Sequence, residues 1–380
     1  MTSYYGYHMR PAASEDNQAL LDMVSSAPMP GAVRLYLERS PDFFAVPGLM
    51  PGETSTDIAE SADHVVTGVQ TQTVCQRSWK GQPVKVLHWG DLRVVASRQS
   101  AGAARALSVK GKERLLESGA DMAMLEMLAG NEPVRRLARL MQEETEPRNE
   151  IVSAGFYNIW QMVPLRQLRP APAAGIRRAT EADLPALADL LREFYKDYFA
   201  VPNFTPEFLR TIFGRHPSFG VGDMWVLERH GRLVACSGLW DQSSFRRLVV
   251  DEVNNLPQKV LKALYPVLRF PLGTGAIPAP GQPFRSRHLC FVACERGQER
   301  ALRDLIRTQL AATRRQQDGT HFLQIAFHER EPAAAALRGL FKLTTRTEIF
   351  YYLPVSRKAQ RPWSNEELAG TMPWTEFALC

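Results

Sequence analysis

The chain has 380 residues, 45% of them hydrophobic, and a formal net charge of +6. This length is too great for one ordinary core and suits two domains. The positive charge is spread thinly, with no basic run and no interleaved aromatic residues, so a nucleic-acid partner is not expected. No apolar stretch is long enough to span a membrane, and the start of the chain has no secretory signal pattern, so the expected location is the cytoplasm.

The five cysteines are scattered and form no Cys-x-x-Cys pair. Neither a disulfide framework nor a metal site is therefore expected. Cys290 and Cys294 flank an apolar run that predicts a strand, and we interpret them as buried thiols.

The first predicted elements occur twice. Residues 9–20 and 176–187 share an apolar residue followed by Arg, then Ala, Asp and Ala-Leu, at a constant offset (176 − 9 = 167 and 186 − 19 = 167). Each segment predicts a short strand, a loop and an amphipathic helix, because acidic residues near a helix start complement the helix dipole. The recurrence predicts an internal duplication.

Consecutive strands are predicted next, over 64–66, 84–88 and 92–96. Their short spacing favours antiparallel pairing. A helix and a strand over 122–128 follow, and this strand–helix–strand order favours a parallel pair. The predicted fold class is therefore α/β with α+β character: a twisted mixed sheet flanked by helices in each copy.

A second echo aligns Gly102 with Gly297 (297 − 102 = 195), each where a predicted helix begins. The two helices end near Gly119 and Gly319. This offset is larger than that of the first echo (195 − 167 = 28), so we expect an insertion in the second copy, within the Pro- and Gly-rich segment 257–283.

The duplication and the composition together predict the domain organisation. The first domain is expected over 1–165 and the second over 176–356, joined by a Pro/Ala-rich, semi-stiff linker over 166–175. The remaining tail, 357–380, is polar with a last aromatic stretch, and could dock on a domain or remain loose.

The segment most informative about chemistry is 92–107, where a β-branched strand stops and a helix begins within a few small residues. The free N–H groups and the dipole of a helix start favour an anion, and small side chains over 100–104 would let a diphosphate approach the backbone closely. An ordinary strand-to-helix turn has the same features, so the residues alone leave both interpretations open. The segment is neither a Walker motif nor the dinucleotide Gly-x-Gly-x-x-Gly pattern.

Three features of this region resemble the GNAT superfamily of acyl-CoA N-acyltransferases. Gln99-x-x-Gly102-x-Ala104 is similar to the family's Q/R-x-x-G-x-G/A signature, and residues 90–94 resemble part of its fourth strand. Asn131 resembles the Asn often found after the fifth strand. Because the order of elements also agrees over nearly the whole of both copies, the chain is identified as a tandem-domain member of this superfamily.

The resemblance implies acetyl-CoA, or another acyl-CoA, as the cofactor. It places the pantetheine in a V-shaped split between the fourth and fifth strands and the pyrophosphate on the backbone that follows. The implied cofactor-binding residues are Val94, Gln99, Ser100, Ala101, Gly102, Ala103, Ala104, Arg105 and Asn131. In the second copy, Cys294 and Glu299 depart from the signature, and carboxylates beside a diphosphate would repel it. We therefore expect one CoA per chain.

Acyl transfer to an amine needs a base, a donor for the thioester oxyanion and a proton for the leaving thiolate. Asp91, His88 and Glu126 are the titratable groups near the fourth and fifth strands, and each is a candidate base. The backbone N–H of Val94 is the candidate oxyanion donor. The family's common acid, a Tyr early in the last helix, is missing from both copies, and Tyr157 on the following strand is a poor substitute by position.

The region before the first sheet is implied to cover the acceptor site. It contains Arg34 and Arg39 in a helix-like run, 32–39. The predicted function is an N-acetyltransferase that moves an acetyl or short acyl group from CoA to a primary amine of a small molecule or a peptide. The alternative is a catalytically silent acyl-CoA-binding or scaffold protein. The acceptor and the oligomeric state do not follow from the sequence.

Overall fold

The computed structural model describes residues 2–29, 34–95, 100–143, 149–215, 218–251, 276–316, 318–356 and 361–379. The elements of the first half are β1 Thr2–Tyr4, β2 Tyr7–Pro11, η1 Ser14–Asp16, α1 Asn17–Ser25, β3 Leu35–Glu38, η2 Phe43–Ala45, η3 Pro47–Leu49, β4 Glu53–Glu60, β5 Val66–Trp79, β6 Gln82–Val94, α2 Ser100–Glu117, β7 Met122–Leu128, α3 Glu132–Glu143 and β8 Glu150–Met162.

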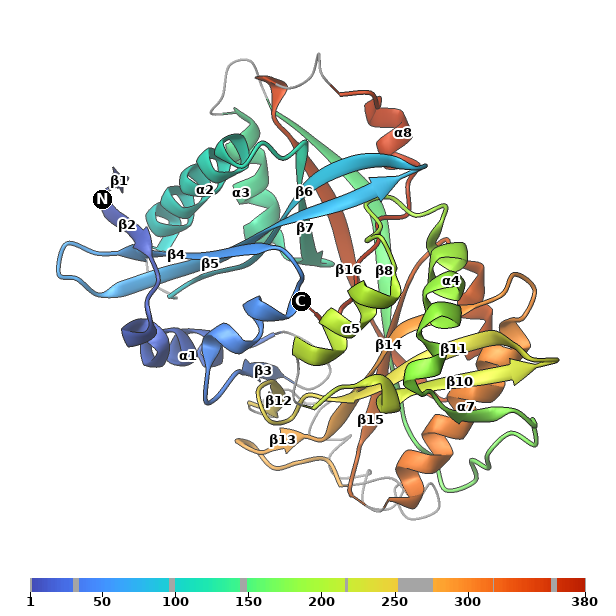
Figure 1. Cartoon of the computed structure of the whole chain (residues 1–380). Helices are drawn as coiled ribbons and strands as arrows, with labels where there is room; N and C mark the ends of the chain where they lie inside the picture. The colour runs from blue at the N-terminus through green and yellow to red at the C-terminus, as the bar shows by residue number, and fades with distance from the viewer. Residues whose placement is uncertain are drawn as a thin grey trace.

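The elements of the second half are β9 Ile176–Arg178, η4 Glu181–Asp183, α4 Leu184–Tyr195, α5 Pro206–Arg215, η5 Val221–Asp223, β10 Met224–Arg229, β11 Arg232–Asp241, β12 Arg247–Val250, β13 Pro283–Phe284, β14 Ser286–Cys294, α7 Glu299–Arg315, β15 Phe322–His328, η6 Pro332–Leu337, β16 Lys342–Leu353 and α8 Asn365–Ala369. Figure 1 shows the two halves side by side, with β8 and β16 running together between them.

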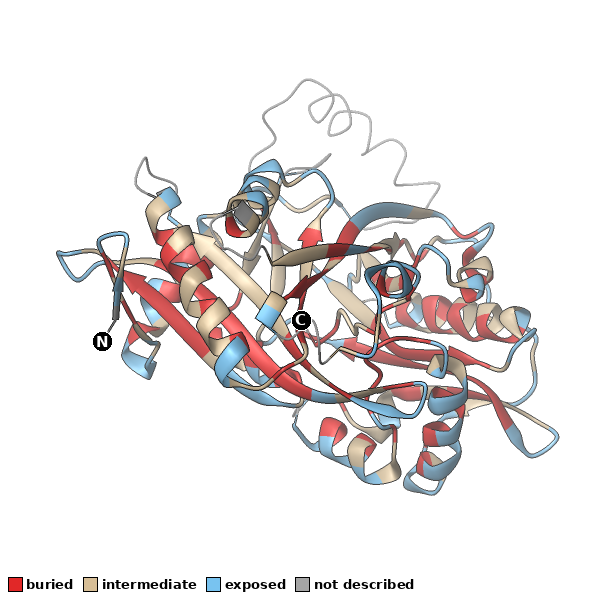
Figure 2. Cartoon of the chain, turned by 90° about the horizontal axis from the view of Figure 1, so that it is seen from above, coloured by how far each residue is buried: buried red, intermediate tan, exposed pale blue. Residues whose placement is uncertain are grey.

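One sheet connects both halves. Within the described residues it has 13 strands, in the order β1-β2-β4-β5-β6-β7-β16-β8-β15-β14-β11-β10-β9. Most pairs are antiparallel, whereas β6 pairs with β7 and β14 with β15 in parallel. The predicted fold class, a mixed α/β sheet flanked by helices, is confirmed. The apolar interior lies on both faces of this sheet, and Figure 2 shows the buried residues concentrated on its strands and on the helix faces turned towards them.

The last strands of the two copies are exchanged. β16, from the end of the second copy, lies between β7 and β8 of the first, and β8 lies between β16 and β15. Each copy therefore completes its half of the sheet with a strand supplied by the other. Sequence periodicity cannot reveal this exchange, because both strands carry the same kind of alternating apolar pattern wherever they pair.

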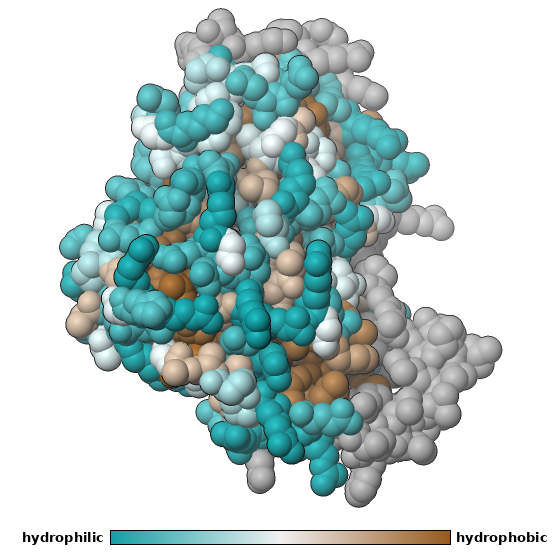
Figure 3. All heavy atoms as spheres, turned by 90° about the vertical axis from the view of Figure 1, so that its right-hand side faces the viewer, coloured by the Kyte–Doolittle hydropathy of each residue, from teal (hydrophilic) through white to brown (hydrophobic). Residues whose placement is uncertain are grey.

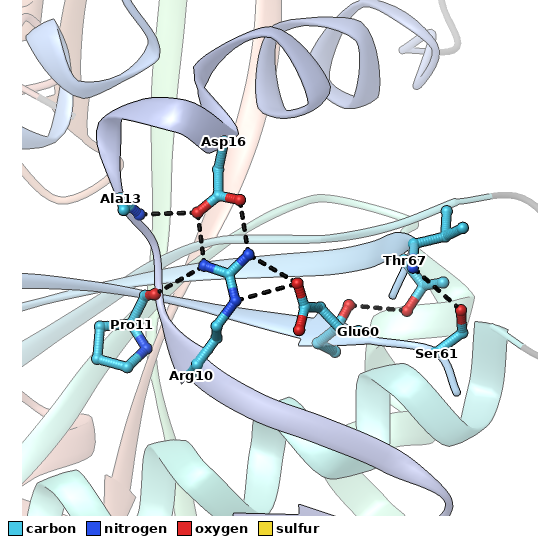
Figure 4. Close-up of polar contacts among 9 residues, drawn as sticks. Arg10, Pro11, Ala13, Asp16, Glu60, Ser61 and Thr67 are labelled. Atoms are coloured by element: carbon cyan, nitrogen blue, oxygen red, sulfur yellow. Dashed lines mark hydrogen bonds and ion pairs between the residues drawn. The ribbon is translucent and has the colours of Figure 1, made fainter. Parts of the chain in front are cut away.

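The first echo corresponds to a repeated ion-pair cluster. In the first copy, the Arg10 guanidinium donates to both carboxylate oxygens of Asp16 at 2.7 Å and to Glu60 Oε1 at 2.6 Å (Figure 4). The Asp16 carboxylate also accepts a hydrogen bond from the Ala13 N–H at 2.8 Å. These bonds from Arg10 hold the pKa of Asp16 below its ordinary value, so the cluster ties β2, the start of α1 and the end of β4 together at neutral pH.

The second copy repeats this cluster at the predicted offset. Arg177 donates to both oxygens of Asp183 at 2.7 Å and to Glu228 Oε2 at 2.8 Å, and the Thr180 N–H donates to Asp183 at 2.7 Å. Arg177 and Asp183 follow Arg10 and Asp16 at the offset of the first echo (177 − 10 = 167 and 183 − 16 = 167). The first predicted repeat is therefore reproduced in side-chain geometry.

The second predicted echo is wrong in register. Gly102 lies inside α2, whereas Gly297 precedes α7 and adopts a φ of +79°. The two glycines that do correspond are Gly119 and Gly319, which follow α2 and α7 in the chain and have φ values of +73° and +76° (319 − 119 = 200). Both glycines are followed three residues later by Arg-Ala-Leu, and this local match does not reflect the position of each helix on the sheet.

Three predicted elements differ from the structure. The two strands expected over 84–88 and 92–96 are one bulged strand, β6, within the described stretch, which ends at 95. The segment 61–65 is mainly turn, and β5 begins at Val66. The helix-like run over 32–39 contains β3, which pairs with β12 in a second, three-stranded sheet. Much of the predicted insertion over 257–283 lies outside the described residues.

The tail docks on the sheet. The Trp374 N–H donates to the Phe199 carbonyl at 2.8 Å, and the Tyr157 hydroxyl donates to the Pro373 carbonyl at 2.6 Å. Trp374 and Leu379 are only 3% and 1% exposed. The tail therefore fills the face of the sheet at the boundary between the two copies.

Candidate active site

A split opens between β6 and β7. The two strands pair from Val86 and Met122 as far as Trp89 and Leu125. Beyond that point β6 continues against β5, while β7 continues against β16. The strands therefore diverge towards their carboxyl ends and leave a wedge with backbone groups on both sides.

A β-bulge explains why β6 turns away. Thr71 pairs with Gly90 and Val69 with Arg93, so Asp91 and Leu92 together oppose a single residue of β5. Asp91 has a φ of +52°, in the left-handed region. An extra residue on one strand bends it and increases its twist, which separates β6 from β7.

Helix α2 begins near the open end of this split. Its first N–H groups lack intrahelical partners and its dipole favours an anion. Ala101 is exposed at this end, whereas Ala103 is fully buried. A Cβ atom on Gly102 would lie 2.9 Å from the ring of Tyr7, so this glycine also lets α2 pack closely on β2. Gln99 lies outside the described residues, as does the side chain of Ser100.

Two of the predicted catalytic residues meet below the split. His88 on β6 and Glu126 on β7 are joined by a 3.3 Å contact between Nε2 and Oε1. Glu126 Oε1 also accepts a hydrogen bond from the Thr375 hydroxyl in the tail. A narrow cavity of about 10 Å³ adjoins them, roughly the space of one water molecule. Its lining residues are Met50, Cys75, Arg77, Val86, His88, Met124, Ala200, Trp374 and Thr375.

The third predicted base, Asp91, has a different environment. Its two carboxylate oxygens accept hydrogen bonds from Arg39 at 2.8 and 2.6 Å, and the Arg39 side chain is only 3% exposed. Burial acts to raise the pKa of Asp91, but Arg39, Arg93 and Arg246 together hold it below its ordinary value. A carboxylate held ionised in this way is a weak proton acceptor, so the geometry favours His88 and Glu126.

Val94 and Asn131 lie on opposite sides of the split. The Val95 N–H donates to the Thr67 carbonyl at 2.9 Å, so strand alternation turns the Val94 N–H away from β5. Asn131 follows β7, and its side chain accepts a hydrogen bond from the Val134 N–H at 3.4 Å. This contact caps α3. Arg105, the last predicted cofactor residue, lies over the Tyr5 ring at 5.8 Å.

The solved structures that resemble the chain over most of its length include the following two. One is the N-myristoyltransferase of Saccharomyces cerevisiae, solved with bound myristoyl-CoA, at 9% identity and a TM-score of 0.63, covering 93% of this chain and 84% of that one. The other is a fungal multi-domain β-N-acetylglucosaminidase with a GCN5-related glucosamine N-acetyltransferase region, at 12% identity and a TM-score of 0.56. That match covers 92% of this chain and 38% of the enzyme. No protein-family model and no curated protein sequence matches the chain.

The chain has the tandem GNAT fold. Within this fold, β6 and β7 are the fourth and fifth strands of the first copy, and β14 and β15 are those of the second. The bulge recurs in the second copy at Phe291, which has a φ of +49°. Phe291 follows Asp91 at the same offset that separates Gly319 from Gly119 (291 − 91 = 200). The predicted duplication of the GNAT unit is therefore visible in the backbone itself.

In the second copy, β14 and β15 pair only as far as His288 and Gln324 and then separate, and carboxylates of the chain itself lie at this second split. The Phe291 N–H, at the bulge, donates to Glu376 Oε2 at 2.7 Å. The Gly297 N–H, just before α7, donates to Glu299 Oε1 at 3.2 Å. Arg296, whose charge could offset that of Glu299, is 88% exposed and lies 3.5 Å from Asp197. The N–H groups of Phe291 and Gly297 are thus occupied by carboxylates of the chain.

Several residues at the site of the first GNAT copy were not predicted. Thr375 and Trp374 come from the tail and Ala200 from the second copy, and all three contact a cavity built mainly on β5, β6 and β7. No local sequence signal marks them, because their role depends on where the tail docks. Tyr157, considered as an acid, is buried and donates to a backbone carbonyl, and burial raises its pKa well above the ordinary value.

The described part of the chain contains no metal-binding cluster, since no group of three or more His, Cys, Asp or Glu side chains there could hold a metal ion. Cys75, Cys236, Cys290 and Cys294 are buried free thiols, as predicted for the last two. None of the described helices combines the length and apolar content needed to cross a membrane. The face in Figure 3 is mostly hydrophilic, with apolar residues in limited areas.

Proposed function

We propose that the chain transfers an acyl group from CoA to a primary amine, with the cofactor in the β6–β7 split of the first copy. The observation that carries the proposal is the divergence of β6 and β7 beside the start of α2. The same fold binds myristoyl-CoA in the yeast N-myristoyltransferase. The pyrophosphate would lie at the N-terminus of α2 and the pantetheine between the two strands.

An acetyl or similarly short acyl group fits this proposal better than a long one. The cavity next to His88 and Met124 has a volume of only about 10 Å³, and Trp374 is among its lining residues. A volume of this size holds about one water molecule, or a methyl group, and not a fatty chain. We therefore propose acetyl-CoA as the donor.

His88 is the proposed general base. When its Nε2–H donates to Glu126, its Nδ1 is the nitrogen that accepts a proton. The amine loses a proton to Nδ1 and attacks the thioester carbon. The C–N bond forms and the C–S bond breaks. The carbonyl oxygen gains negative charge in between, which the Val94 N–H would stabilise. Glu126 stabilises the imidazolium, the CoA thiolate takes a proton from water, and the imidazolium then gives its proton to the hydroxide that remains.

The test is thiol release from acetyl-CoA with a panel of primary amines, measured on the full chain. Release that depends on an amine supports the proposal. CoA binding without release for any amine would favour the silent acyl-CoA-binding alternative. Failure to bind CoA at all would overturn the assignment of the split as a cofactor site.

A further inference from the structure

A cluster of arginines surrounds the β6 bulge. Arg39 forms the bidentate pair with Asp91, and Arg93 and Arg246 are both near enough to Asp91 to affect its ionisation. These three guanidinium cations lie near two carboxylates, Asp91 and Glu376, because Arg246 also acts on the ionisation of Glu376. Arg246 also donates to the Ala378 carbonyl of the tail at 3.0 Å. The excess of positive charge beside the split would attract an anionic ligand.

Arg93 is the member of the cluster that the protein does not satisfy. Its Nε is buried without a hydrogen-bond partner, and within the described residues its guanidinium forms no hydrogen bond or ion pair. The Nε of Arg39 is likewise buried and unpartnered. Arginine has five N–H donors, and buried donors in folded proteins are nearly always paired. Donors left open beside a split are suited to a bound ligand.

Arg93 lies on the face of the sheet opposite to α2, on the same side as His88. Leu92 and Val94 pack with α2, so Arg93 between them lies on the opposite face. His88 lies on this opposite face too, since Val86 and Met124 beside it belong to the cluster away from α2. The cofactor phosphates are expected at α2. The open donors of Arg93 thus face the side from which the acceptor approaches.

We propose that the acceptor is a primary amine that carries an anionic group, a carboxylate or a phosphate, which Arg93 binds with the support of Arg39. This inference rests on the proposed function and adds the chemical class of the substrate. A planar guanidinium with paired N–H groups matches both anions, so one arginine serves either. The anion would orient the amine for attack and take up part of the uncompensated charge.

Steady-state kinetics on matched amine pairs tests the inference. The pairs are butylamine with 4-aminobutyrate and ethanolamine with O-phosphoethanolamine, which separate a carboxylate from a phosphate. We expect the anionic member of at least one pair to have a KM at least tenfold lower. Arg93→Gln should raise that KM about tenfold or more, and it should leave the KM values for the neutral amine and for acetyl-CoA unchanged. Arg93→Lys, which keeps the positive charge, should raise the KM for the anionic amine less.

Arg232→Gln is the matched control, since this arginine is 77% exposed and pairs with Glu295 away from the split. Turnover of the neutral amines reports that the Arg93 variant is folded. Turnover with equal KM for both members of each pair would overturn the inference while leaving the proposed function intact. If no amine is acetylated, calorimetry of the same four amines in the presence of CoA decides: binding of an anionic amine that Arg93→Gln abolishes supports the inference, and its absence refutes it.

Discussion

At the scale of single residues, the three candidate bases have different environments. His88 and Glu126 contact each other across β6 and β7, next to a small cavity. Asp91, further along β6, is held by Arg39. Sequence position could not distinguish them, because all three lie on the same two strands.

The His88 side chain gives the first prediction. Replacing it by Asn should lower kcat by about 10²–10⁴-fold, the usual contribution of a general base, with little change in the KM for acetyl-CoA. The measurement is thiol release with a saturating amine. His64→Asn on an exposed turn is the matched control. Unchanged kcat in the His88 variant would exclude it as the base.

The Asp91–Arg39 ion pair gives the second prediction, which concerns stability. Asp91→Asn keeps a side chain that tolerates positive φ but leaves the Arg39 charge buried and unpaired. We expect the free energy of unfolding to fall by about 3–5 kcal/mol, measured with urea. A stable variant with a large loss of kcat would instead identify Asp91 as the catalytic base.

The Glu376 side chain gives the third prediction, which concerns the pH dependence of folding stability. Burial raises the pKa of Glu376 from 4.5 to about 7, opposed by the bonds from the Phe291 and Ala378 N–H groups. A raised carboxyl pKa means that the folded state binds the proton more tightly, so this group's contribution to stability falls as the pH rises from 4.5 to 7. Glu376→Gln should therefore weaken the loss of stability between pH 5 and pH 8, followed by thermal unfolding. If stability depends on pH in the same way in the variant and in the unmodified protein, the raised pKa of Glu376 is wrong.

At the scale of elements, α2 combines two roles in its first turn. Ala103 is buried against the sheet, and Gly102 has no space for a Cβ beside Tyr7. A charged residue at 102 would therefore disturb packing as well as any bound phosphate, and loss of CoA binding in Gly102→Glu would have two explanations. Ala101 is exposed at the same helix end and separates them.

Ala101→Glu gives the fourth prediction. A carboxylate at this helix end should repel the CoA pyrophosphate and weaken its binding at least tenfold, about 1.4 kcal/mol. Calorimetry measures the affinity, and circular dichroism confirms the fold. Leu116→Glu, at an exposed position near the other end of α2, is the control. Equal CoA affinity in the two variants would show that the phosphates lie elsewhere.

At the scale of the whole molecule, duplication has produced two unequal splits. The first has its bulge beside an arginine cluster, and the second has its bulge N–H bonded to Glu376 of the tail. Glu376 of the tail thus occupies the bulge N–H of the second copy, while Thr375 and Trp374 of the tail line the cavity of the first copy. The exchanged strands β8 and β16 make both splits parts of one sheet.

The fifth prediction is therefore one CoA per chain. The second copy should not bind CoA with comparable affinity, because Glu376 and Glu299 occupy its backbone donors. A calorimetric titration of the full chain should saturate at one equivalent. Saturation at two equivalents of similar affinity would show that the tail leaves the second split when CoA is present.

The sequence by itself determined the fold class, the duplication and the position at which α2 begins. These follow from local patterns: apolar periodicity, Gly at helix ends and a repeated Arg–Asp spacing that reappears as the Arg10 and Arg177 clusters. It also proposed Asp91, His88 and Glu126 as candidate bases because they lie near the fourth and fifth strands, and the structure brings His88 and Glu126 into contact.

Only the tertiary structure decided the rest. The strand exchange, the docking of Thr375 on Glu126 and the filling of the second split by Glu376 depend on contacts between segments that are far apart along the described chain. Nothing in the local sequence encodes such a contact, because the free energy that fixes it comes from burying surfaces against each other after the elements have formed. The open donors of Arg93 became visible for the same reason, once the bulge, Arg39 and the sheet face were placed together.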